Sequence, residues 1–161
     1  MQKNVVYIQL DGYLAEWLVN RFGNPVRFPS RSWENIILAR YLSKKSSAPS
    51  SPSNTGHLIP ICVPAVTDKP FSIYNHLPTR AEAMLIASIE SIFRLDMFYS
   101  LIHCVVDINE HVDVWCSQRG IDSEHREAVR QKFYRIRRDY EKNGVFLRKK
   151  YSKKLKYVKR T

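Results

Sequence analysis

Residues 109–144, NEHVDVWCSQRGIDSEHREAVRQKFYRIRRDYEKNG, decide the C-terminal part of the fold. Before Gly120, the apolar residues fall on one side of a short helix, and glycine is the residue that most readily adopts the left-handed backbone conformation ending a helix. Ile121 is then expected to pack back over the turn, and Asp122 or Ser123 can cap a second, longer helix. The sequence therefore predicts two helices joined by a tight turn, in the order of a helix-turn-helix.

The second helix is expected to have one apolar and one basic face. Projected at about 100° per residue, Val129, Phe133, Ile136 and Tyr140 form a narrow stripe that should be packed inward. The adjoining face carries arginine, glutamine and tyrosine, which suit the major groove of duplex DNA. The residues expected to bind nucleic acid from this helix are Arg126, Arg130, Gln131, Tyr134, Arg135, Arg137, Arg138 and Lys142. The residues expected to be free of partners within the protein are Arg130, Gln131, Tyr134, Arg135 and Arg138.

Basic residues are concentrated after the turn. Residues 126–161 contain 15 Lys or Arg and 3 Asp or Glu, whereas residues 1–125 contain 11 and 12. The net charge of +11 therefore comes from the end of the chain, a distribution typical of a near-neutral body with a polyanion-binding segment. The alternative is a solvated tail that only aids solubility. The phosphate contacts expected in the tail, VFLRKKYSKKLKYVKRT, are Arg148, Lys149, Lys150, Lys153, Lys154 and Lys156.

The N-terminal region is expected to be a small α/β unit. Residues 5–10, VVYIQL, have the β-branched and aromatic character of a strand, and Asp11 can cap the helix that follows. A short second strand is predicted at residues 26–28, with Ser30 or Ser32 capping the next helix. The short N-terminal strand also permits a homodimer through strand pairing.

The middle of the chain is expected to supply an edge strand and the main core helices. Residues 58–66, LIPICVPAV, contain two prolines that lack an amide donor, which confines a strand to a sheet edge. Residues 79–82, TRAE, have the form of a capping box. The apolar run that follows, residues 83–106, should be helical with a break or continuation near residues 95–98. Its central charged residues argue against a membrane span.

Together these patterns predict a mainly helical α+β protein. A Ser/Pro-rich stretch without hydrophobic periodicity separates its first two parts. The expected segments are an α/β unit at 1–42, a flexible linker at 43–57, an edge strand and core helices at 58–108, a helix-turn-helix-like basic pair at 109–144, and a basic tail at 145–161.

We find no sequence motif that predicts catalysis. The sequence has no glycine-rich phosphate loop, no Gly-x-Ser-x-Gly, no Cys-x-x-Cys and no His-Glu-x-x-His. His103, Cys104, His111, Cys116 and His125 match no standard zinc-finger spacing. We therefore expect a protein that is not an enzyme, with no catalytic residue, cofactor or metal.

The segment AVRQKFYRIRRDYEKNG, residues 128–144, resembles the third helices of helix-turn-helix and Myb-like modules. The overall plan, VYIQLDGYLAEWLVNRFG followed by VRFP and a basic C-terminal helix, also resembles small uncharacterised proteins encoded in prophages and mobile elements of gut Bacteroidales. These resemblances imply a DNA-binding protein encoded by a phage or mobile element.

The function expected from the sequence is non-enzymatic binding of nucleic acid, with duplex DNA as the partner, in regulation, replication or recombination of a phage or mobile element. One alternative is an RNA- or single-strand-binding module that stacks bases on Tyr134, Tyr151 and Tyr157. Another is a structural or protein-interaction component whose basic tail contacts an acidic partner. Three cysteines without framework spacing, and no signal-peptide pattern, favour a cytoplasmic protein with no membrane partner.

Overall fold

A computed structural model describes residues 4–45 and 56–147. The predicted fold class, mainly helical α+β, is confirmed: the described residues form five α-helices, one short 3-10 helix and a two-stranded antiparallel sheet. The elements, in chain order, are β1 (Val5–Leu10), α1 (Gly12–Phe22), α2 (Trp33–Tyr41), β2 (His57–Cys62), α3 (Thr79–Ile102), α4 (Ile108–Gln118), η1 (Ser123–His125) and α5 (Arg126–Lys142).

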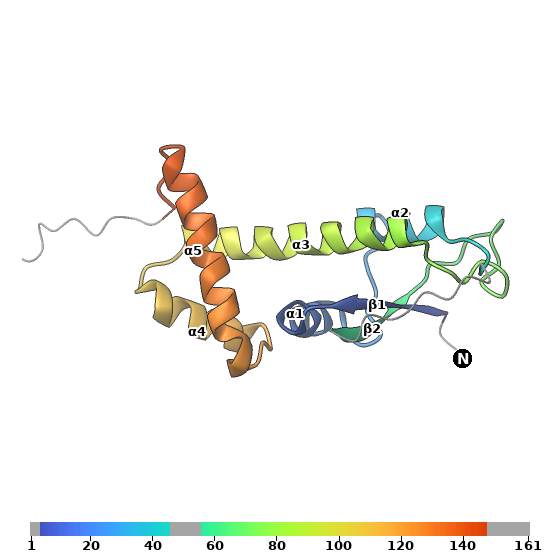
Figure 1. The fold of residues 1–161 in the computed structure, drawn as a ribbon, viewed down its shortest axis with the longest axis horizontal. Helices are drawn as coiled ribbons and strands as arrows, with labels where there is room; N and C mark the ends of the chain where they lie inside the picture. Colours follow the sequence, from blue (N-terminus) through green and yellow to red (C-terminus); the bar gives the residue numbers. More distant parts are fainter. Residues whose placement is uncertain (1–3, 46–55, 148–161) are drawn as a thin grey trace, which may run out of the picture.

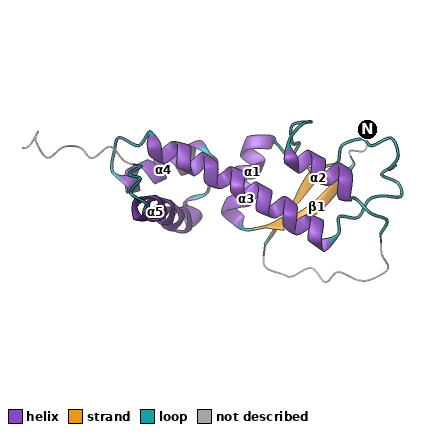
Figure 2. Ribbon diagram, turned by 90° about the horizontal axis from the view of Figure 1, so that it is seen from above, coloured by secondary structure: helices purple, strands orange, loops and turns teal. Residues whose placement is uncertain are grey.

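The molecule is built along α3, which continues without a break through residues 95–98. Figure 1 shows α3 running from the sheet, α1 and α2 at one end to α4 and α5 at the other. Figure 2, turned by 90°, shows the same division into two groups of elements. The buried side chains of α3 recur every fourth residue: Ala81, Leu85, Ile89, Phe93, Met97 and Leu101.

This spacing explains how one helix serves both groups. A step of four residues advances about 40° around a helix, so the buried stripe winds around α3 along its length. The stripe can therefore face different neighbours in turn, and α3 contacts α2, α1 and α5.

An aromatic series joins the two groups through the core. Trp17 of α1 packs edge-on against Phe93 of α3, with ring centroids 5.2 Å apart. Trp115 of α4 lies 5.7 Å from Phe93 and 5.1 Å from Phe133 of α5, again nearly perpendicular. Such pairs contribute about 0.5–1.5 kcal/mol each beyond their burial. The helix pair at the C-terminal end is thus part of the same hydrophobic core as the N-terminal unit.

The sheet contains only part of the predicted β structure. β1 agrees with its predicted range, whereas β2 ends at Cys62, before Pro64. The predicted strand at residues 26–28 is wrong: Val26 forms only an isolated bridge, donating its N–H to the Pro60 carbonyl and accepting from the Cys62 N–H, both at 2.8 Å. Prolines on both sides of this short segment remove the amide donors that a ladder needs.

The predicted helix starts are confirmed in part. The Ser32 side chain caps α2 by accepting from the Asn35 N–H at 3.2 Å, and Asp122 accepts from the Glu124 N–H at 3.0 Å before α5. The predicted capping box at Thr79 is wrong, because Pro78 occupies the N-cap position and no side chain bonds to an end amide. Asp11 is at the N-cap of α1, but its carboxylate accepts from the Tyr13 hydroxyl instead of an amide.

Candidate nucleic-acid interface

The turn between α4 and α5 has the geometry predicted from Gly120. This glycine has φ +68°, and the following Ile121 is buried and donates its N–H to the Cys116 carbonyl at 3.0 Å. The turn lies against α1, since the Asp122 N–H donates to Glu16 Oε2 at 2.8 Å. A Cβ on Gly120 would stand 2.8 Å from the Asn20 side chain, so glycine also permits this close approach.

Asp96 of α3 fixes the end of α4 just before this turn. Arg119 donates to both oxygens of Asp96, at 2.8 and 3.0 Å, and Trp17 of α1 donates its indole N–H at 3.0 Å. Burial alone would raise the pKa of Asp96, but the hydrogen bonds from Arg119 and Trp17 outweigh it and lower the pKa below its ordinary value. The charged carboxylate therefore ties three helices together.

His125, at the start of α5, lies directly on α1. A Cβ on Gly12 would be 2.6 Å from two atoms of the His125 ring, closer than any side chain permits. The His125 Nε2 atom also lies 3.8 Å from Glu16 Oε1. These contacts orient α5 relative to the N-terminal unit.

The apolar stripe predicted for α5 is largely confirmed. Val129, Phe133 and Ile136 are buried. Tyr140 is 36% exposed, and its ring packs on Phe98 of α3 at 5.0 Å. The side of α5 that meets the core could therefore be identified from the sequence.

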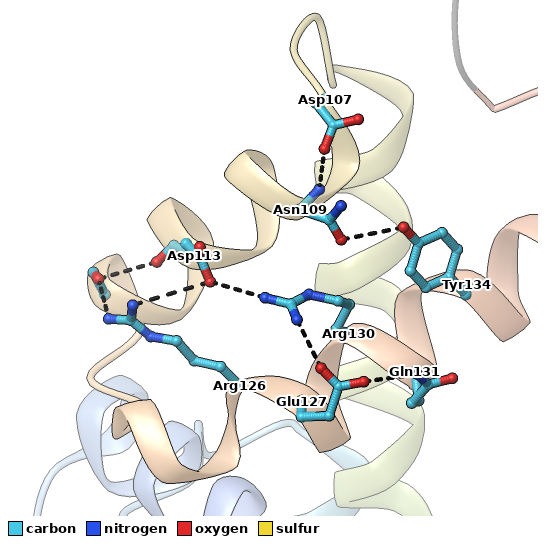
Figure 3. A network of polar contacts seen from close by, with 9 residues as sticks. Asp107, Asn109, Asp113, Arg126, Glu127, Arg130, Gln131 and Tyr134 are labelled. Atoms are coloured by element: carbon cyan, nitrogen blue, oxygen red, sulfur yellow. Dashed lines mark hydrogen bonds and ion pairs between the residues drawn. The ribbon is translucent and has the colours of Figure 1, made fainter.

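The prediction that Arg130 is free is wrong. Its Nη1 donates to Glu127 at 2.6 Å and its Nη2 to Asp113 of α4 at 3.4 Å (Figure 3). Arg126 turns the same way and donates to the Ser117 hydroxyl at 3.1 Å. Both positions border the buried stripe, so their side chains extend over α4 and meet acceptors there.

Three further predicted contact residues also have partners within the protein. The Tyr134 hydroxyl donates to the Asn109 side chain at 3.2 Å, and the exposed Gln131 donates to Glu127 at 2.8 Å, so neither is free as predicted (Figure 3). The Arg137 guanidinium lies 4.9 Å from the centre of the Tyr134 ring. Tyr134 thus connects α5 with α4, whereas Gln131 and Arg137 contact other side chains of α5.

Arg135, Arg138 and Lys142 behave differently. All three are exposed, and none makes a hydrogen bond or ion pair with another described residue. Their spacing of three and four residues places them in one row about 10 Å long on the side of α5 away from the core. We call these three residues the outward row. The other predicted contacts, Arg148, Lys149, Lys150, Lys153, Lys154 and Lys156, lie outside the described residues.

A cleft beside the outward row contains basic residues that the sequence analysis missed. It has a volume of about 240 Å³ and lies between α1, α3 and α5. Arg94 and Lys132 line it together with Arg135. A helical projection of α5 places Lys132 and Arg130 on opposite borders of the apolar stripe, so the position of Lys132 could have been found from the sequence. No sequence signal places Arg94 next to α5.

The cysteines and histidines considered for metal binding have other surroundings. Cys104 and Cys116 are buried, and burial raises the pKa of the Cys116 thiol to about 11. His111 shares a hydrogen bond with Ser100, and burial lowers its pKa. In the part of the chain that the structure describes, no three His, Cys, Asp or Glu side chains form a group able to hold a metal ion.

No described helix is both long and apolar enough to cross a membrane. Comparison of the chain with protein-family models, curated proteins and solved structures finds no match.

Proposed function

We propose that this chain is a non-enzymatic DNA-binding protein that contacts the phosphates of duplex DNA through the outward row of α5 and the basic residues after it. The observation that carries the proposal is the row itself: three exposed cations, aligned on one helix face, with no partner among the described residues. Phosphates are the ligands that such unpaired guanidinium and ammonium groups bind in duplex DNA.

The C-terminal residues add to this positive charge. Residues 148–161 contain 8 Lys or Arg and no Asp or Glu. Neutralising phosphates with these groups releases condensed counterions from DNA, which is favourable at low salt and independent of base sequence. The row and the C-terminal residues thus support tight, salt-dependent binding.

Sequence readout contributes little in this proposal. Arg126, Arg130 and Tyr134, which the sequence places toward the groove, are engaged with α4 and would have to leave Asp113, Ser117 or Asn109 to reach a base. Breaking those contacts costs part of the free energy that a hydrogen bond to a base supplies. The proposed role is that of a cytoplasmic accessory protein in regulation, replication or recombination of a phage or mobile element.

Binding to a labelled DNA duplex, measured at several salt concentrations, tests the proposal. The full chain is compared with a chain ending at Leu147, because Leu147 is buried and belongs to the described core. We expect the full chain to bind with a steep salt dependence, and the shorter chain to bind more weakly with a shallower one. The absence of binding by the full chain at about 50 mM salt would contradict the proposal.

Competition identifies the preferred nucleic acid. An unlabelled duplex should displace the labelled one at lower concentration than structured RNA of equal charge. Preferential displacement by RNA would instead favour the alternative of an RNA-binding module. Equal displacement by a polyanion without bases, such as heparin, together with no preference among nucleic acids, would favour a basic segment that serves an acidic protein partner.

A further inference from the structure

We infer that the cleft between α1, α3 and α5 binds one unpaired nucleobase together with its phosphate. This inference rests on the proposed nucleic-acid binding and adds a ligand to it: a nucleotide that is not base-paired, as in a single-stranded stretch or a frayed end. Three features of the cleft lead to it, namely its apolar lining, its charged rim and its continuity with the outward row.

The lining suits a flat apolar ring. Leu14, Phe93, Met97 and Ile136 are buried side chains that reach the cleft, and the half-buried Tyr13 ring lies 5.6 Å from Phe93. The cleft, at about 240 Å³, is smaller than the roughly 300–1,000 Å³ of sites for drug-sized molecules. The Tyr13 ring, the half-buried aromatic side chain of this lining, can accept the face of any base by stacking.

The rim carries three cations and two carboxylates. The cations are Arg94, Lys132 and Arg135, and the carboxylates are Glu90 and Asp139. Asp139 is paired with Arg94 at 3.3 Å, with both side chains more than half exposed, so the pair is weak and Arg94 can exchange it for a phosphate. Lys132 lies 5.1 Å from the centre of the Tyr13 ring and has no carboxylate partner among the described residues. The rim therefore favours a group with negative charge.

Two polar groups can meet the edge of the base. The Glu90 carboxylate has no hydrogen bond or ion pair with any other described residue, and a carboxylate only accepts hydrogen bonds. It therefore selects bases with an exocyclic amine, such as adenine and cytosine, over thymine. The Tyr13 hydroxyl donates to Asp11 at 3.3 Å, and its oxygen can also accept a hydrogen bond from the base.

Arg135 connects the cleft with the outward row. It lines the cleft and is also the first residue of the row, so a strand whose phosphates follow the row has a phosphate at the mouth of the cleft. The base attached to that phosphate can enter the cleft only when it is not paired. The outward row then binds the phosphates of a duplex while the cleft stays empty, and it binds the phosphates of a single strand while one base enters the cleft.

Methionine-methyl NMR tests this inference with a built-in control. Met97 lines the cleft, whereas Met84, on the same helix, does not. Titration with adenosine 5′-monophosphate at millimolar concentrations should shift the Met97 methyl signal through the ring current of the base and leave Met84 unchanged. Ribose 5-phosphate should leave both unchanged. An unmoved Met97 signal, or an equal response to ribose 5-phosphate or to benzoate, would overturn the inference.

A second experiment separates the base from the phosphate. Single-stranded oligoadenylate is compared with an abasic strand of equal length and charge. We expect the full chain to bind the base-containing strand about tenfold more tightly, which is within the contribution of one stacked base. Glu90→Gln and Lys132→Gln, at the rim, should reduce this ratio, whereas the matched control Lys142→Gln should weaken both strands and keep the ratio.

The outcomes distinguish the inference from the proposed function. Equal binding of the two strands, with salt-dependent duplex binding intact, overturns the cleft as a base site and leaves phosphate binding by the row. A shift of Met97 by adenosine 5′-monophosphate without duplex binding overturns the proposed function and leaves the cleft as a site for a free nucleotide.

Discussion

Arg119, at the end of α4, donates hydrogen bonds to both oxygens of Asp96 on α3, at 2.8 and 3.0 Å. The carboxylate is 11% exposed and also accepts from Trp17 of α1 at 3.0 Å. Two charged partners held in this planar, two-bond geometry fix both distance and orientation. The position of α4, and with it the direction of α5, therefore depends on a carboxylate in the C-terminal third of the long helix α3.

Replacing Asp96 with asparagine should lower the free energy of unfolding by about 2–3 kcal/mol, because Arg119 keeps its charge but loses the carboxylate in a mostly enclosed site. Urea denaturation measures the loss. Asp139→Asn is the matched control, since its partner Arg94 and Asp139 itself are mostly exposed. That control should cost less than about 1 kcal/mol, and equal losses in the two variants would show that Asp96 is no more than a surface partner.

The Asp96 contribution should disappear in acid. Its pKa is lower in the folded protein than the ordinary value of 3.8, so the folded state binds fewer protons than the unfolded state and stability rises with pH. The difference in unfolding free energy between wild type and Asp96→Asn should be constant above about pH 5 and shrink as the pH falls below about 4. Urea titrations at each pH give this difference. A difference that grows on acidification would contradict the assignment.

Gly12→Ala should destabilise the protein through a steric clash with His125. The added Cβ would be 2.6 Å from two ring atoms, and overpacking of this kind costs about 1–3 kcal/mol. In a protein that carries His125→Ala, the same Gly12 substitution should cost little, because the ring is gone. A double-mutant cycle by chemical denaturation measures the coupling. Equal costs in the two backgrounds would place the strain elsewhere.

The three cysteines should differ in reactivity. Cys116 is fully buried with a thiol pKa of about 11, and thiolates are the reactive form. Cys104 is buried and Cys62 is partly exposed. A thiol reagent at pH 8 should therefore modify Cys62 first in the native protein and all three in urea. Rapid modification of all three in native conditions would show that the core around α4 opens readily.

The inward side of α5 was predictable because it depends on one helix alone. Val129, Phe133 and Ile136 repeat at helical spacing, and no knowledge of a neighbour is needed to place them together. The same holds for Gly120, whose backbone conformation ends α4 whatever packs around it.

The outward side was predictable only in part, because some partners of its side chains depend on where α4 and α3 lie. Arg135 and Arg138 are exposed and make no hydrogen bond or ion pair with another described residue, as predicted. Arg130, which was also predicted to be free, borders the buried stripe and pairs with Glu127 on its own helix and with Asp113 on α4. Only the second of these partners depends on the position of α4. The cleft residues Tyr13, Arg94 and Lys132 come from three distant segments. The wrongly predicted strand around Val26 has a local cause: its residues are strand-like, but the flanking prolines limit its pairing to one bridge.

The central claim is that cations on the outward side of α5, and not those beside α4, bind phosphates. The most direct measurement compares two double variants that remove equal charge from the same helix: Arg135→Gln with Arg138→Gln, and Arg126→Gln with Arg130→Gln. Duplex affinity over a salt series and unfolding free energy are measured for both.

We expect the Arg135 and Arg138 variant to keep its stability within about 0.5 kcal/mol and to lose affinity, with the slope of log affinity against log salt shallower by roughly two. The Arg126 and Arg130 variant should lose about 1 kcal/mol of stability and less affinity. A larger loss of DNA affinity from the Arg126 and Arg130 variant, or unchanged affinity and slope in the other, would contradict the claim.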